Sequence, residues 1–274
     1  MTNMKFRFHE TFPPQIIYLA EILKLSSENY CGSKNDISNI TGIPTGDSTG
    51  KVVPHIRYLS YMGLIQFEME LGKYKLSLTE LGNIVFNEDP YIMQDITKLI
   101  LHYNMTRLIE GAPQWSYFFR EYPYEYNIKI MFSDIEDQGK KKFAKDIEIG
   151  PLKSMYISDD FNIISNLDIS KGNRQEVIFN VNNPMFEATN LYAYGLLYDW
   201  ELILPESKEI TIDDILNLLR WEKAFGFDYD TMLEVLDEIS ARGIIKINKQ
   251  LNPVTIIRNM NSSDLIETLY DDVI

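Results

Sequence analysis

The feature that most constrains this chain is a change of hydrophobic period within its first 88 residues. Apolar side chains recur every three or four positions in FPPQIIYLAEILKLSS, which begins at Phe12, and again in VVPHIRYLSYM, which begins at Val52. Between these segments, Asn35 or Asp36 can cap a short helix that Gly42 ends. The spacing therefore predicts three helices, each with one buried face.

The period changes to two directly after the third predicted helix. The segment LIQFEMELGKYKLSL alternates apolar and polar side chains on both sides of Gly72 and Lys73, which favours a β-hairpin. Thr79 then has the position of a helix cap. Three helices followed by a hairpin are typical of a winged helix-turn-helix domain, and we predict one over residues 1–88.

The middle of the chain is predicted to be mainly helical. Over residues 89–182 we expect helices and a small strand pair, with EVIFNV as one strand. The aromatic segment QWSYFFREYP could stack on bases, but we expect its side chains in the core because aromatic clusters between apolar helices usually pack. We interpret DIEDQGKKKFAKDIEIG as an exposed charged loop that leads to a short helix.

Residues 183–274 show the same pattern as the N-terminal segment, with predicted helices followed by two predicted strands. A helix beginning at Asn183, a helix capped near Thr211 and a helix ended by Gly243 precede two strand candidates, IIKIN and VTIIRN. We predict a C-terminal winged-helix-like module here. The expected fold class is therefore mainly α with small β-hairpins (α+β), in three consecutive regions.

Charge is distributed unevenly along the chain. The formal net charge is −14, yet residues 1–85 hold eight Lys and Arg against eight Asp and Glu, so the excess lies in the remainder. Phosphate binding is largely electrostatic, so only the N-terminal region can approach DNA without strong repulsion. Residues 199–274 hold seven basic against sixteen acidic side chains, and we expect them to contact protein.

A glycine-rich run, GIPTGDSTGK, precedes the third predicted helix. A nucleotide-binding P-loop needs Gly, four residues, Gly, Lys and then Ser or Thr. Here Gly46 is one residue too close to Gly50, and Val52 replaces the hydroxyl. The run has two other interpretations: an exposed turn, or a helix N-terminus that holds a DNA phosphate through Ser48, Thr49, Gly50 and Lys51.

The third predicted helix offers side chains for DNA recognition. We expect His55, Arg57 and Tyr58 to lie off its buried stripe, where they could donate to phosphates or base edges. A winged helix can also dock on protein, and this one has no excess of basic residues. DNA contact and protein contact both stay open.

The sequence identifies no catalytic residue. Carboxylate pairs such as Asp159 and Asp160 arise by composition in so acidic a chain, and the three histidines lack metal-ligand spacing. No metal site and no other cofactor is expected from these patterns. One cysteine and the lack of a signal-peptide or membrane-helix pattern favour a soluble cytoplasmic protein with no membrane contact.

Two longer segments carry a family resemblance. FHETFPPQIIYLAEIL, from Phe8, and GKVVPHIRYLSYMGLI, from Gly50, resemble the DUF4007 family, whose members open with His-Glu-Thr-Phe and later carry Gly-Lys…Ile-Arg-Tyr. A weaker likeness extends through GAPQWSYFFREYP and LYAYGLLYDWELILP. Gln15 and Tyr18 stand where relatives often have Arg and Trp.

The resemblance implies a bacterial protein encoded among DNA phosphorothioation and phage-defence genes, beside a sulfurtransferase-like partner. Some relatives look like the DNA-nicking component of such systems, which would require Mg²⁺ or Mn²⁺. Within the signature, Glu10 beside His9 could pair with Arg57 or Lys51 if the first and third helices meet. Such a pair would either lock the N-terminal segment to the third helix, which we favour, or form a site for phosphate chemistry.

We therefore predict a DNA-binding component of a phosphorothioation and phage-defence system, which positions DNA and, in one interpretation, nicks it as a metal-dependent enzyme. Its expected partners are DNA and proteins of the sulfur-modification system. Two alternatives remain: a winged-helix transcription regulator that binds a promoter as a homodimer, and a scaffold that docks proteins without catalysis.

Overall fold

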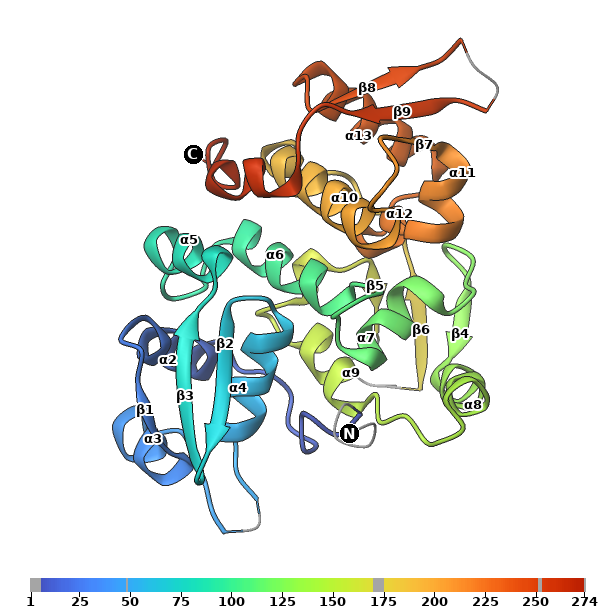
Figure 1. Cartoon of the computed structure of the whole chain (residues 1–274). Coiled ribbons are helices and arrows are strands. Elements are labelled where there is room, and N and C mark those ends of the chain that lie inside the picture. The colour runs from blue at the N-terminus through green and yellow to red at the C-terminus, as the bar shows by residue number, and fades with distance from the viewer. Residues whose placement is uncertain (1–5, 48, 170–174, 251–252, 274) are drawn as a thin grey trace.

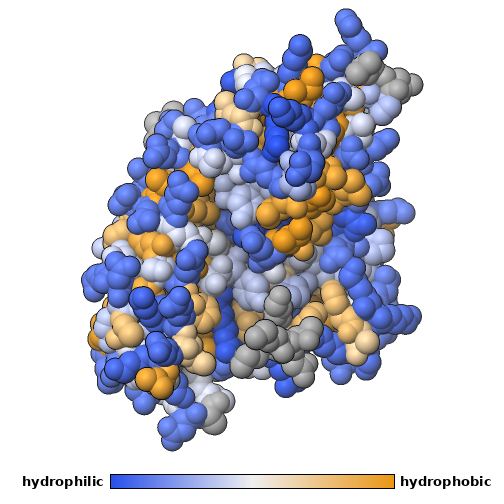
Figure 2. Space-filling view, viewed as in Figure 1, coloured by the Kyte–Doolittle hydropathy of each residue, from blue (hydrophilic) through white to orange (hydrophobic). Residues whose placement is uncertain are grey.

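The computed structural model describes residues 6–47, 49–169, 175–250 and 253–273 of the chain. Within this part, helices predominate and the strands form three antiparallel sheets of three strands each, which confirms a helix-rich α+β fold. The N-terminal and C-terminal sheets lie at opposite ends of the molecule, with the middle region between the two terminal units (Figure 1). Hydrophilic residues cover most of the face shown in Figure 2, and hydrophobic residues form separate patches.

The N-terminal unit contains the three helices and the hairpin that the periodicity predicts. Its elements are α2 (Ile16–Ser27), β1 (Cys31–Ser33), α3 (Lys34–Thr41), α4 (Val52–Tyr61), β2 (Ile65–Glu70), β3 (Lys73–Leu78) and α5 (Glu80–Glu88). The strand order is β1-β3-β2. Sequence reasoning missed β1, because three residues are too short for an alternating pattern to be recognised.

Local signals set the ends of these elements. Ser33 caps α3 through a capping box with Asp36, two positions before Asn35, the first of the two caps we expected, and Gly42 ends that helix at φ 72°. Thr79 caps α5 as predicted. Leu71 and Gly72 both have positive φ, which gives the two-residue hairpin turn that matches strand twist.

The C-terminal unit repeats the element order and strand order of the N-terminal unit. It contains α10 (Thr189–Ile203), β7 (Glu209–Thr211), α11 (Ile212–Asp214), η4 (Ile215–Leu219), α12 (Trp221–Phe225), α13 (Tyr229–Ala241), β8 (Ile245–Asn248) and β9 (Thr255–Arg258), with strand order β7-β9-β8. The Thr211 cap and the pairing of the last two strands are confirmed. The third strand of this sheet, β7, was missed for the same reason as β1.

The start of α10 differs from the prediction. We expected a helix from Asn183, but a short η3 (Phe186–Ala188) and then α10 begin later. The backbone N–H and side chain of Asn182 donate to the carbonyl oxygens of Gly226 and Phe225, 2.8 and 2.9 Å away. These bonds tie the segment before η3 to residues 225 and 226, and residues 180–185 are not helical.

The middle region supplies the third sheet and most of the aromatic core. It contains α6 (Asp95–Thr106), α7 (Pro113–Ser116), η1 (Tyr117–Glu121), β4 (Lys129–Met131), α8 (Phe132–Phe143), α9 (Gly150–Ile157), η2 (Asn162–Ile164), β5 (Leu167–Asp168) and β6 (Glu176–Phe179), with strand order β4-β6-β5. Trp115, Phe118 and Phe119 are fully buried, which confirms that these aromatic side chains pack in the core.

The charged segment of the middle region was predicted wrongly as a loop. Most of it forms α8, which buries Phe132, Ile135 and Gly139 on one face. Asp134 lies in its first turn and a run of lysines in its last turn, an arrangement that favours the helix dipole. The charges obscured the narrow apolar stripe.

A buried ion pair joins the middle region to the C-terminal unit. Arg120 of η1 donates to Asp199 of α10 with 2.5 Å between Nη1 and Oδ2, and both side chains are almost fully buried. The guanidinium also lies over the Tyr103 ring, 5.3 Å from its centroid. Removing either partner would leave an unpaired buried charge, so the two regions depend on each other.

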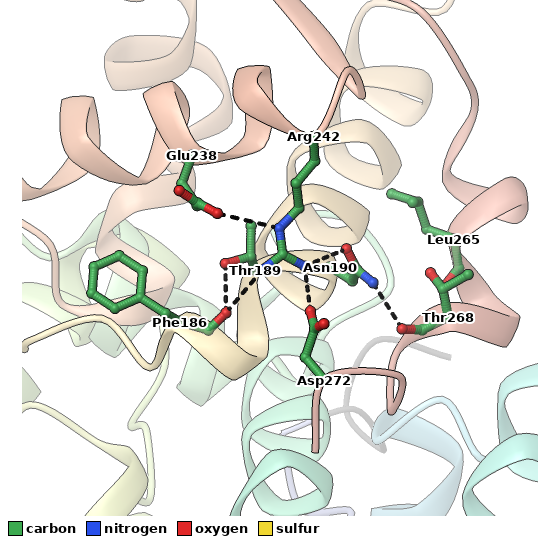
Figure 3. A network of polar contacts seen from close by, with 8 residues as sticks. All are labelled: Phe186, Thr189, Asn190, Glu238, Arg242, Leu265, Thr268 and Asp272. Carbon is green, nitrogen blue, oxygen red and sulfur yellow. Dashed lines mark hydrogen bonds and ion pairs between the residues drawn. The ribbon is translucent and has the colours of Figure 1, made fainter. Parts of the chain in front are cut away.

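The C-terminal segment is fastened by a polar network around Arg242 (Figure 3). Arg242 follows α13 and donates to Asn190, Phe186 and Asp272, while Asn190 donates to the Thr268 carbonyl at the end of η5 (Ser262–Thr268). Beyond η5, the Tyr270 hydroxyl lies 2.8 Å from Thr97 Oγ1 on α6. The segment thus connects the C-terminal unit to the middle region.

The Arg242→Ala variant is expected to loosen this segment. It removes hydrogen bonds to three structural elements and should lower the free energy of unfolding by roughly 1–2 kcal/mol. Hydrogen exchange should become faster in residues 262–273 by a larger factor than in α2, whose exchange reports only the loss of overall stability. Lys249→Ala, which breaks only an exposed pair with Asp237, is the control. Equal exchange in both variants would contradict the role of the network.

Candidate functional site

The first residues of α2 and α4 lie side by side and share one histidine. Gln15 precedes α2 and Lys51 precedes α4 as their cap residues. His55 Nδ1 lies 2.6 Å from the Lys51 carbonyl oxygen, and His55 Nε2 accepts the Gln15 N–H at 3.1 Å. A neutral ring protonated on Nδ1 satisfies both contacts. His55 therefore positions both helix starts.

The Lys51 side chain lies over this junction. Its Nζ is 3.4 Å from Gln15 Oε1 and lies 5.3 and 5.9 Å from the ring centroids of Tyr18 and Phe12. Among the described residues, no carboxylate forms an ion pair with Lys51. Aromatic faces stabilise a cation without neutralising it, unlike a carboxylate.

The turn before α4 holds Lys51 in place. Thr45 and Gly50 form an isolated bridge, and the Lys51 N–H donates to the Pro44 carbonyl oxygen at 2.8 Å. A Cβ on Gly50 would lie 2.7 Å from Thr45 Cα, so only glycine fits there. Thr49 is exposed, and Ser48 lies outside the described residues. The Lys51 amide is already used internally, which corrects the expectation that it faces a phosphate.

Two of the three predicted recognition side chains are buried. His55 and Tyr58 have no exposed surface, so the expectation that they face a DNA groove is wrong. The Tyr58 hydroxyl donates to the Phe12 carbonyl oxygen at 2.9 Å, and its ring packs against Phe8 and Trp115. The physical reason is that residues 6–12 and α7 cover a second face of α4, beyond the stripe that periodicity identified.

The His-Glu-Thr-Phe signature forms this cover. Glu10 and Thr11 have φ values of 46° and 75°, and the Phe12 N–H donates to the His9 carbonyl oxygen at 2.8 Å, as in a type I′ turn. The Thr11 N–H also donates to His9 Nδ1 at 3.1 Å. A β-branched residue rarely adopts positive φ, so the buried His9 stabilises an unfavourable turn.

Arg57 attaches the signature turn to α4. Its Nη1 lies 3.4 Å from Glu10 Oε1 and 3.4 Å from the Phe8 carbonyl oxygen. The predicted pairing of Glu10 with Arg57 is therefore confirmed, whereas Lys51 is not its partner. The pair is partly exposed, and its contacts support the structural interpretation.

An acidic pocket of about 630 Å³ lies beside the signature turn, lined by Thr11, α8 and the start of α9. Three of its four carboxylates have basic partners, in the pairs Lys140–Asp146, Arg7–Glu148 and Lys153–Glu136, and Asp137 is the fourth. Within the described ranges, no group of three or more His, Cys, Asp or Glu side chains is arranged to hold a metal ion. Sequence reasoning missed this pocket, because the folding of α8 back toward α9 and the approach of Thr11 leave no local sequence pattern.

The outer surfaces of the two repeated units differ in charge. On the N-terminal hairpin, Lys73 and Lys75 lie opposite Glu70 and Glu68 in the register, so the hairpin is neutral. The helix of the C-terminal unit that corresponds to α4 is α13, whose exposed positions include Asp230, Glu234 and Asp237. A phosphate backbone would be repelled by α13 but not by the N-terminal hairpin.

These features can be compared with known proteins. The family model for DUF4007, described as a protein of unknown function, matches residues 6–191, and the chain belongs to this family. Crystal structures of magnesium ion-bound SspB and of SspB share the fold, with TM-scores of 0.76 and 0.75. Each is 15% identical and covers 98% of this chain and 88% of the SspB chain. No curated protein matches the sequence.

The helices of the described ranges include none that is long and apolar enough to cross a membrane.

The shared histidine predicts a pH-dependent stability. Burial lowers the pKa of His55 to about 4, below the value of an unfolded histidine. The neutral His55 therefore contributes fully to the free energy of unfolding above pH 6.5, and this contribution is lost as pH falls toward 4. His55→Gln should be less stable at neutral pH. Between pH 7 and pH 5, the free energy of unfolding of the variant should fall by roughly 2 kcal/mol less than that of the unaltered chain, as measured by denaturant unfolding. Parallel pH profiles of the two proteins would contradict this assignment.

Proposed function

We propose that this protein is the DNA-binding component of a bacterial DNA phosphorothioation and phage-defence system. The observation that carries the proposal is membership in DUF4007, the family whose resemblance implies that setting. The SspB-like fold over nearly the whole chain agrees with it. We further propose that the N-terminal unit acts as a winged helix-turn-helix, since its element order is compatible with that motif.

The proposed DNA contact is made by residues at the start of α4 and not by side chains along the helix. Lys51 lies at the helix start, carries a charge that no described carboxylate neutralises, and adjoins the exposed Thr49. Lys73 and Lys75 are exposed on the hairpin, where a winged helix carries its second phosphate contacts. These groups bind phosphates in any sequence, so the mode that we propose has weak base preference.

The C-terminal unit is proposed to bind a protein of the same system. The acidic outer face of α13 supports this, because the corresponding surface would oppose DNA. Basic partner surfaces would be attracted to it. The protein-docking role of the scaffold alternative is therefore proposed for the C-terminal unit alone. It would apply to the whole chain if the N-terminal unit failed to bind DNA.

Duplex DNA binding by the full chain tests the proposal. Affinity should fall as salt rises from about 50 to 200 mM, and Lys51→Ala should weaken binding several-fold and reduce the magnitude of the salt slope by about one. Lys249→Ala, on the C-terminal unit, should bind like the unaltered chain. Failure of the unaltered chain to bind at low salt would refute DNA binding and favour the scaffold. Strong preference for one promoter would favour the regulator.

A nicking assay addresses catalysis separately. One of the two SspB structures is magnesium ion-bound. The described residues of this chain include no group of three or more His, Cys, Asp or Glu side chains arranged to hold a metal ion, and we derive no metal-dependent step. Under the positioning proposal, supercoiled plasmid should stay closed with the pure protein and Mg²⁺ or Mn²⁺. Open circles that require the protein would assign nicking to this chain.

A further inference from the structure

A second pocket, of about 500 Å³, lies where the two repeated units and the middle region meet. It adjoins the end of α4, whereas Lys51 precedes that helix. Its walls come from the N-terminal unit, the end of α6, α10 and η5, and include Tyr61, Gln66, Asn104, Arg107, Tyr194 and Tyr198. The volume is typical of small-molecule sites, and three tyrosines with several polar groups line it.

Arg107 is the cation of this pocket. Its guanidinium lies over Tyr198, 4.5 Å from the ring centroid, and the side chain is 7% exposed. Glu110 is its carboxylate partner among the described residues, at 3.5 Å from Nη2, and is 53% exposed. The Tyr198 hydroxyl donates to Glu110 at 3.1 Å. A loosely placed, exposed carboxylate can be displaced from a buried arginine by an anionic ligand.

Two polar atoms in the pocket wall have no hydrogen-bond partner within the described part of the chain. They are Arg107 Nε, which is a donor, and Asn104 Oδ1, which is an acceptor. The amide nitrogen of the same Asn104 side chain donates to the Ile100 carbonyl oxygen. A buried unsatisfied polar atom costs about 1–3 kcal/mol, so such atoms call for an explanation. A ligand that presents an acceptor to Arg107 and a donor to Asn104 would satisfy both.

We propose that this pocket binds one nucleotide carrying a phosphodiester monoanion. The phosphate would replace Glu110 on Arg107, and the base would contact the tyrosine faces and Asn104. Glu80 also lines the pocket, which disfavours a dianionic phosphate. The same chemistry occurs in a single DNA strand and in a cyclic nucleotide. This inference is independent of duplex binding at Lys51.

Calorimetric titration of the full chain tests the proposal with a short single-stranded oligonucleotide and, separately, with cyclic AMP and cyclic GMP. We expect at least one ligand to bind with a dissociation constant below about 1 mM, which identifies the source. A 5′-monophosphate should bind several-fold more weakly. Equal binding of the monophosphate, or binding of none of these probes, would overturn the proposal.

Variants at the pocket give a test in both directions. Glu110→Gln removes the competing carboxylate and should tighten binding several-fold, whereas Glu125→Gln, an exposed acid elsewhere, should change nothing. Arg107→Lys keeps the charge but loses the planar donor group, and should weaken binding at least ten-fold. Because Glu110→Gln alters an exposed side chain, its result does not depend on tolerance at Arg107. Unchanged binding in Glu110→Gln would overturn the assignment of the phosphate position.

Discussion

The packing of residues 6–12 between α4 and α7 is the interaction on which the N-terminal half of the molecule depends. Phe8 contacts the rings of Tyr58, Tyr61 and Trp115, with centroid distances of 5.0, 4.6 and 5.7 Å. Such aromatic pairs stabilise beyond their buried area. They fix the N-terminal unit against the middle region and cover a second face of α4.

This cover explains why the family signature has its particular residues. A type I′ turn normally uses glycine or asparagine, yet here it contains Glu10 and Thr11. The contacts of His9 with Thr11, and of Arg57 with Glu10, stabilise that turn. The signature residues thus serve the junction between the two regions.

The repeated architecture has opposite electrostatic consequences at its two ends. Both units have the same strand order, but in the N-terminal unit no described carboxylate neutralises Lys51 at a helix start, whereas α13 presents carboxylates. One fold can therefore serve two kinds of partner, because surface charge and not backbone topology sets what approaches it. The junction between the units adds the Arg107 pocket, whose walls come from several regions together.

The sequence by itself determined the local elements of this protein. Periodicity identified the helices and hairpin strands of the N-terminal unit but not α8, and Thr79, Thr211 and Gly42 act as the predicted caps, because these signals depend on neighbours within a few residues. It also gave Arg57 and Lys51 as the two candidate partners of Glu10, of which the structure selects Arg57. Only the tertiary structure decided that His55 and Tyr58 are buried, that Lys51 lies beside Gln15, and that Asn104 and Arg107 line a shared pocket. A periodic pattern reports one buried face of a helix, whereas contacts between distant segments decide whether a second face is covered.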